Sequence, residues 1–169
     1  MWAKQAGDSR SADYQTFPNA VTRVIGDKLL LHRLLTKYRL ASCAPKTFDV
    51  LPDYLHYLKT TKQDVFCFLK ISHEAGGIGV MCFKNLRPLL DYLNGQQNTT
   101  NAFVIQQGIQ NPKLIDGYKF KIRVYVLLTK RWDLYVHDDM LVVLHDEKYD
   151  PNSVPLHNLE CNGWPYIHP

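Results

Sequence analysis

The sequence predicts an α+β fold in which antiparallel sheets are flanked by helices. One segment, residues 27–40, repeats its apolar residues at helical spacing, strand-like runs occur in hairpin-like pairs, and the last third of the chain is strand-rich. No internal repeat or low-complexity tract is present. The 169 residues, of which 46% are hydrophobic, suffice for one domain or for two small lobes that share a cleft.

The expected elements of the first hundred residues are helices around a strand pair. Residues 27–40 place leucines on one helical face and most of their cations elsewhere, which predicts a helix. A short extended segment between two prolines follows, and a second helix is expected at residues 54–58. Apolar runs at 64–71 and 78–83 predict a hairpin with a mobile, glycine-bearing tip. A short helix closed by glycine is expected at 85–95.

The remaining elements are expected to be strands. Residues 102–107 and 118–129 are predicted as single strands. A hairpin is expected over residues 132–144, with its turn about Asp138 and Asp139.

The net charge and the cysteine pattern limit the kinds of partner and the cellular compartment that we expect. The net charge of +4 favours anionic partners, such as nucleotide phosphates, acidic peptide segments or nucleic acid, without choosing among them. Four cysteines without a CxxC pair favour a reducing compartment. Because there is neither an apolar signal core nor a run of about 20 apolar residues, we expect a cytosolic protein without a membrane partner.

The strand at residues 118–129 carries three cations on one face. Lys119, Lys121 and Arg123 alternate with apolar residues, so they line up over roughly 13 Å at about 3.3 Å per residue. Water could satisfy these charges, or a multiply charged anion could lie across them. The aromatic residues Tyr118 and Phe120 face the other way, which makes a base-stacking nucleic-acid surface an unfavourable interpretation.

A second cationic feature is Lys70, which ends an apolar strand just before a loop with three glycines. Burying an unpaired lysine is costly, so Lys70 must reach an anion or water. The loop contains Gly76, Gly77 and Gly79, and it matches neither the P-loop nor the GxGxxG pattern. It is either an ordinary turn or a loop that folds over phosphates, in which case it and the cationic strand would form opposite walls of a phosphate site.

An ordered series of motifs resembles the tubulin–tyrosine ligase-like family, a branch of the ATP-grasp superfamily. The motifs are KTFDVLP, FLKISHEAGGIGV, FVIQQGIQNPKLIDGYKFKIRVYVLLT and EKY. The resemblance covers roughly residues 20–150 and is most specific between Gln106 and Thr129. It implies an ATP-grasp-like fold with a nucleotide cleft between two antiparallel lobes, incomplete at its C-terminal side.

The resemblance also implies roles for individual residues. Lys119 and Arg123 would face the phosphates and the transferred group, as catalytic residues. The residues implied to bind ATP are Lys28, Lys70, Gly76, Gly77, Gly79, Gln106, Gln107, Gly108, Ile109 and Lys119. Among them, Lys70 would contact the phosphates, and the backbone around Gln106 to Ile109 would border the adenine. Glu160 and Asn162 resemble the Mg²⁺ ligands of an LExN motif, or else the segment LHNLECN is a blurred copy of an HLTN-like stretch at which the domain is truncated, which is the favoured interpretation. Under either interpretation the expected metal site is incomplete.

The reaction implied by the resemblance is an ATP- and Mg²⁺-dependent ligation. A carboxylate on an acidic protein tail, with tubulin as the expected partner, is converted to an acyl-phosphate and then receives glutamate, glycine or tyrosine. This implies a cytoplasmic location associated with the cytoskeleton or with cilia.

Three departures from the family pattern support an alternative hypothesis. Lys121 stands where an acidic residue is expected, and Val143 stands where an arginine is expected. The third departure is length, because the family carries a long segment with an acidic metal ligand between the position of Tyr149 and the LExN motif. We therefore expect a partial ligase domain at residues 20–150, preceded by a flexible arm at 1–19 and followed by a truncated or rearranged tail at 151–169. The chain is therefore either a ligase or a catalytically dead module that binds nucleotide or tubulin.

Overall fold

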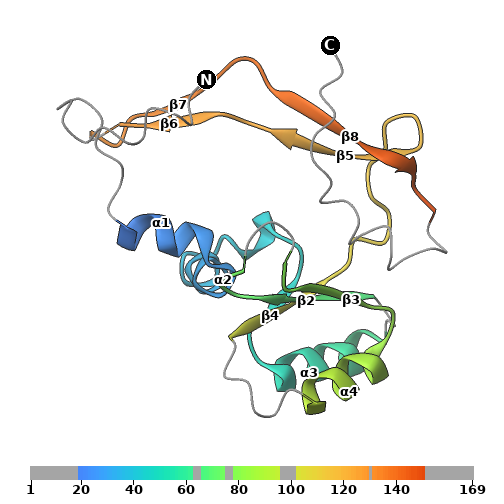
Figure 1. Cartoon of the computed structure of the whole chain (residues 1–169). Helices are drawn as coiled ribbons and strands as arrows, with labels where there is room; N and C mark the ends of the chain where they lie inside the picture. Colours follow the sequence, from blue (N-terminus) through green and yellow to red (C-terminus); the bar gives the residue numbers. More distant parts are fainter. Residues whose placement is uncertain (1–18, 63–65, 75–77, 96–101, 130, 151–169) are drawn as a thin grey trace.

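The structure of the chain is a computed structural model that combines helices with antiparallel strands (Figure 1). It describes residues 19–62, 66–74, 78–95, 102–129 and 131–150. The predicted tail, and all but the last residue of the predicted arm, lie outside the described residues.

The α+β prediction is confirmed by the order of elements. They are α1 (Asn19–Gly26), α2 (Lys28–Lys37), the 3-10 helix η1 (Ala41–Cys43), β1 (Thr47–Phe48), α3 (Leu51–Thr61), β2 (Cys67–Ile71), β3 (Val80–Phe83), α4 (Leu86–Gly95), β4 (Phe103–Gln107), β5 (Tyr118–Arg123), β6 (Val126–Leu128), β7 (Leu134–Val136) and β8 (Leu141–Lys148). The predicted helices are found as α2, α3 and α4, whereas α1 was not expected. None of the described helices combines the length and the apolar character that a membrane span requires.

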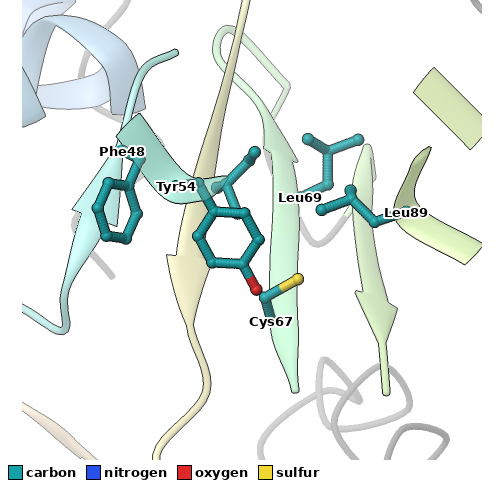
Figure 2. Close-up of a cluster of buried hydrophobic side chains, with 6 residues drawn as sticks. Phe48, Tyr54, Cys67, Leu69 and Leu89 are labelled. Atoms are coloured by element: carbon teal, nitrogen blue, oxygen red, sulfur yellow. The ribbon is translucent and has the colours of Figure 1, made fainter. Parts of the chain in front are cut away.

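Four antiparallel strands form the central sheet, in the order β1-β4-β2-β3. Helices α3 and α4 cover one face of it (Figure 1). Because strand side chains alternate between faces, Leu69 and Ile105 point toward these helices and are almost fully buried. They pack with Tyr54 of α3 and Leu89 of α4, together with Phe48 and Cys67, and this cluster is the core (Figure 2).

The opposite face of the sheet carries a more polar set of side chains and is here called the open face. Its residues come from all four strands by the same alternation: Thr47, Phe68, Lys70, Val80, Cys82, Val104 and Gln106. The strands β5 to β8 lie on this side of the sheet, away from α3 and α4 (Figure 1).

The predicted strand at 118–129 is divided, and the predicted hairpin turn is wrong. Strand β6 pairs with β7, and β5 pairs with β8, so the four strands form one long two-stranded ribbon. The chain reverses between Thr129 and Asp133, because the Thr129 hydroxyl oxygen accepts the Asp133 backbone N–H at 3.1 Å and closes the turn. Asp138 and Asp139 lie instead in a bulge, where residues 137–140 face residues 124–125.

Much of the apolar surface of this ribbon is exposed. Leu127 and Leu134 are 63% and 64% exposed, and Ile122 is 54% exposed. Among the described residues, β5 pairs only with β8 and β6 pairs only with β7, so no further strand extends the ribbon. In the described part of the chain, its apolar side chains are therefore much less covered than those of the central sheet.

Candidate functional site

Lys70 lies half-buried on the open face and takes part in a chain of hydrogen bonds that crosses three strands. Its Nζ donates to Gln106 Oε1 at 2.6 Å, and Gln106 Nε2 donates to Thr47 Oγ1 at 3.0 Å. The Thr47 hydroxyl donates in turn to the Pro45 carbonyl at 2.7 Å. The partner of Lys70 is thus a neutral amide, which holds the ammonium group in place without cancelling its charge.

The electrostatic surroundings of Lys70 favour the loss of its proton. Burial lowers the pKa of Lys70, and the nearby charge of Lys28 lowers it further. No carboxylate forms a salt bridge with Lys70 within the described residues. A bound anion would compensate both effects, since an opposite charge favours the ammonium form.

Lys28 holds the start of the glycine-bearing loop. Its Nζ donates to the carbonyl oxygens of Ile71, at 3.1 Å, and of Glu74, while its backbone N–H donates to the Ser72 carbonyl at 3.2 Å. Ser72 is only 2% exposed, and its hydroxyl donates to the Asp27 carboxylate that caps α2. The N-terminus of α2 is therefore tied to the end of β2, and the expected contact of Lys28 with nucleotide stays a prediction.

The loop itself closes on Gly79, which adopts the left-handed backbone region at φ +68°. A Cβ there would meet Glu74 Cγ at 2.9 Å and Ile71 Cβ at 3.0 Å. The Gly79 carbonyl accepts the Ile71 N–H at 2.8 Å, which completes the hairpin. Gly76 and Gly77 lie outside the described residues, so their predicted role stays a prediction.

A hollow of about 250 Å³ lies where β4 ends. It is lined by Pro45, Lys46, Gln107, Gly108, Ile109 and Gln110. Gln107, Gly108 and Ile109, which are expected to border adenine, therefore line the same hollow. Gln106, the fourth such residue, comes just before them on β4 and lies on the open face. The Gln107 side chain points toward the core instead, where its Oε1 accepts the Tyr57 hydroxyl at 3.0 Å.

Gly108 brings the chain close to Phe66 at the edge of this hollow. The Gly108 N–H donates to the Phe66 carbonyl at 2.8 Å. A Cβ on Gly108 would lie only 2.0 Å from Phe66 Cε2, so only glycine fits this backbone path. The shape of the hollow thus depends on a close approach that sequence reasoning did not detect.

The three cations of β5 differ in their surroundings. Lys119 is half-buried, and its Nζ lies 4.5 Å from the centroid of the Tyr149 ring, whereas Lys121 and Arg123 are exposed. Burial raises the pKa of the Cys82 thiol to about 12, to which Cys67 contributes, while the positive charge of Lys119 opposes the rise. The positive charge of Lys119 is thus near enough to favour the thiolate form of Cys82, a residue of the open face.

The two departures from the family pattern within the ribbon face each other. Lys121 lies directly opposite Val143 in the pairing of β5 with β8. The position where the expected charge is reversed and the position where it is missing therefore form one cross-strand pair. The sequence alone did not indicate that the two positions are neighbours.

The predicted metal site is not tested. Glu160 and Asn162 lie outside the described residues. Within the described part of the chain, no group of three or more His, Cys, Asp or Glu side chains could hold a metal ion.

Comparison with known proteins confirms the expected family. The profile of the Tubulin-tyrosine ligase family matches residues 6–162, nearly the whole chain. The chain therefore belongs to the tubulin-tyrosine ligase family.

Several curated proteins with similar sequences are tubulin polyglutamylases and glycylases. Human "Tubulin polyglutamylase TTLL7" is 28% identical over 109 residues, which is 63% of this chain and 11% of that protein. "Tubulin glycylase 3C" of Tetrahymena thermophila is 30% identical over 56% of this chain and 9% of that protein. Mouse "Probable tubulin polyglutamylase TTLL2" is 29% identical over 77% of this chain and 24% of that protein. The chain thus spans less than a quarter of the length of each of these relatives.

A solved structure also resembles the chain. It is the C-terminal domain from K. lactis Pby1, an ATP-grasp enzyme interacting with the mRNA decapping enzyme Dcp2. The similarity covers 78% of this chain and 42% of that chain, with 24% identity and a TM-score of 0.45.

Replacing Lys28 with methionine is expected to loosen the start of the glycine-bearing loop. Two backbone carbonyls would lose a charged donor, and hydrogen bonds to charged groups each contribute about 1.5–3 kcal/mol. Amide hydrogen exchange over residues 71–80 should accelerate at least several-fold. Lys84→Met changes an exposed lysine just beyond β3 and serves as the control; equal exchange in both variants would contradict the holding role.

Proposed function

We propose that this chain binds ATP on the open face of the central sheet and contributes this site to an amino-acid ligase that modifies the acidic tail of tubulin. The observation that carries the proposal is Lys70, a half-buried cation held by the neutral amide of Gln106 beside a glycine-bearing loop. The names of the relatives, tubulin polyglutamylases and glycylases, support the substrate class. Association with the cytoskeleton follows from that substrate.

Two features of the described residues support a place for such a nucleotide, the hollow at the end of β4 and the cation Lys70. In this proposal the backbone of Gln107, Gly108 and Ile109 borders the base in the hollow of about 250 Å³. Lys70 and the loop closed by Gly79 hold the phosphates. When bound, ATP supplies the phosphoryl group that activates a carboxylate toward an amine.

The remaining cations complete the proposed site. In this proposal Lys119, on the ribbon, would neutralise negative charge that develops during transfer, with Arg123 further along the same strand. We place the ligase portion at residues 20–150. Glu160 and Asn162 remain the proposed ligands of Mg²⁺, whose oxygen preference they match.

A second candidate function is a binding module without catalysis. The pairing of Lys121 with Val143 favours it, because both departures from the family pattern meet at one place on the ribbon. Such a module would keep the contacts of Lys70 and the hollow, which lie on other strands, and lose only turnover.

A thermal melt of the purified 169-residue chain tests the nucleotide site. MgATP at about 100 times its dissociation constant should stabilise a folded state that alone binds it by roughly 2.7 kcal/mol. Magnesium chloride without nucleotide is the control for a metal effect. A cooperative transition that MgATP leaves unmoved would contradict the proposed site.

Turnover separates the two candidate functions once binding is established. The chain would be incubated with tubulin, MgATP and glutamate, glycine or tyrosine, and the tubulin tails would be weighed by mass spectrometry. Addition of an amino acid would exclude the binding module, whereas binding without any addition would favour it.

A further inference from the structure

Thr47 lies on the edge strand of the central sheet, directly opposite Gln106 on β4. A threonine hydroxyl has one proton to donate and lone pairs with which to accept. The structure directs this proton to the Pro45 carbonyl at 2.7 Å. Toward Gln106, at 3.0 Å, Thr47 therefore offers only a lone pair, so it can contact only the N–H end of the amide.

The Gln106 side-chain amide has an oxygen, which accepts hydrogen bonds, and an NH₂ group, which donates them. Each of its two partners can bond to only one of these groups. With Nε2 directed at Thr47, Oε1 faces the Lys70 ammonium at 2.6 Å. The reversed amide would place N–H groups against the ammonium, which has no acceptor, and would place an oxygen against the Thr47 lone pair. Lys70 and Thr47 therefore require the same orientation of the amide, and Thr47 reinforces it from β1, a strand that does not pair with the strand of Lys70.

We propose that Thr47 is a positioning residue for the nucleotide site: its hydroxyl orients the Gln106 amide, and this amide holds Lys70 ready for an anionic phosphate group. The inference rests on the proposed function, and it adds a residue that neither the motifs nor the family resemblance assigns. Thr47 contacts Lys70 only through Gln106, so its effect is indirect.

The same arrangement explains why a neutral amide suits this position. A glutamate at position 106 would pair with Lys70 and cancel the charge that an incoming phosphate requires. It would also compete with the Pro45 carbonyl for the single proton of the Thr47 hydroxyl, so one of the two contacts would be lost. Thr47 and Gln106 are therefore matched to each other and to a cation that must stay available.

Thr47 also connects the lysine to the hollow. The carbonyl that it contacts belongs to Pro45, and the neighbouring Lys46 carbonyl accepts the Gln107 N–H at 2.8 Å. Pro45, Lys46 and Gln107 all line the hollow. The hydroxyl thus lies between the proposed base site and the proposed phosphate site.

Two matched substitutions in the full chain test the role of the hydroxyl. Thr47→Val keeps the branched shape but removes donor and acceptor, whereas Thr47→Ser keeps both. NMR of the nucleotide-free chain would follow the Gln106 side-chain amide and the Lys70 ammonium signals, and calorimetry would give the MgATP dissociation constant. We expect Thr47→Val to shift both signals and to weaken MgATP binding roughly 3- to 10-fold, with Thr47→Ser within about twofold of the original chain.

The outcomes separate this inference from the proposed function. If the original chain binds MgATP and Thr47→Val binds it equally well, or if the Gln106 and Lys70 signals do not change, the positioning role is overturned. If Thr47→Val changes those signals but even the original chain ignores MgATP, the proposed function is overturned, and the role toward phosphate with it. A loss of binding that Thr47→Ser shares would indicate general damage to β1 and would also overturn the assignment to the hydroxyl.

Discussion

Replacing Lys70 with methionine is expected to weaken MgATP binding by about 10- to 100-fold. Charge-assisted hydrogen bonds contribute about 1.5–3 kcal/mol, and every 1.4 kcal/mol changes a dissociation constant about tenfold. The free energy of unfolding should change little, because the loss of the hydrogen bond to Gln106 is offset by the removal of a half-buried charge whose pKa burial lowers. The measurement is calorimetric titration with MgATP, together with a melt in the absence of nucleotide.

The matched control for this substitution is Lys59→Met. Lys59 lies in the last turn of α3, the helix that packs on the other face of the sheet. It removes the same charge from the chain, so a general effect of net charge on ATP binding would appear in both variants. Similar dissociation constants for Lys70→Met and Lys59→Met would contradict the assignment of Lys70.

Replacing Gly108 with alanine is expected to destabilise the chain by about 3 kcal/mol or more. The added Cβ would overlap the Phe66 ring at 2.0 Å. The ring has little room to retreat, since it packs edge-on against Phe68 with centroids 5.7 Å apart. Overpacking usually costs about 1–3 kcal/mol and occasionally more, and this overlap is severe. Urea unfolding followed by circular dichroism would measure the change in the free energy of unfolding.

Gly95→Ala is the control for the glycine substitution, because nothing lies within 4 Å of a Cβ at that position. It should leave stability nearly unchanged. In a Phe66→Ala background, Gly108→Ala should cost much less stability than in the original chain if the overlap is the cause of the loss. Equal stability of the two single glycine variants would show that the Phe66 ring moves aside freely.

The local elements of this chain could be predicted because their signals are local. Asp27 precedes the apolar residues of α2 and caps it, with Oδ1 accepting the backbone N–H groups of Leu29 and Leu30 at 3.0 Å each. The strands of the β2–β3 hairpin are short apolar runs that join through a glycine-bearing loop. The position of Lys70 at the end of one such run was visible in the sequence, and so was the density of charge on β5.

What could not be predicted depends on contacts between distant segments. The ribbon turn was misplaced because Thr129 and Asp133 close it through a side chain, whereas the sequence offered only the acidic pair at 138–139 as a turn signal. The pairing of β1 with β4 joins residues 59 positions apart, so nothing near Thr47 revealed its contact with Gln106. Gln106 itself was expected to serve through its backbone, and the structure shows its side chain holding Lys70.

The ribbon of β5 to β8 gives the chain an uneven stability. An isolated two-stranded sheet is only marginally stable in water, and here much of its apolar surface is exposed, whereas the central sheet has a core of fully buried side chains such as Ile105 and Leu89. Local opening needs least free energy where buried apolar contacts are fewest. The chain therefore has an order of unfolding built into it: the strands that carry Lys119 and Arg123 separate first, while Lys70 and the hollow stay folded.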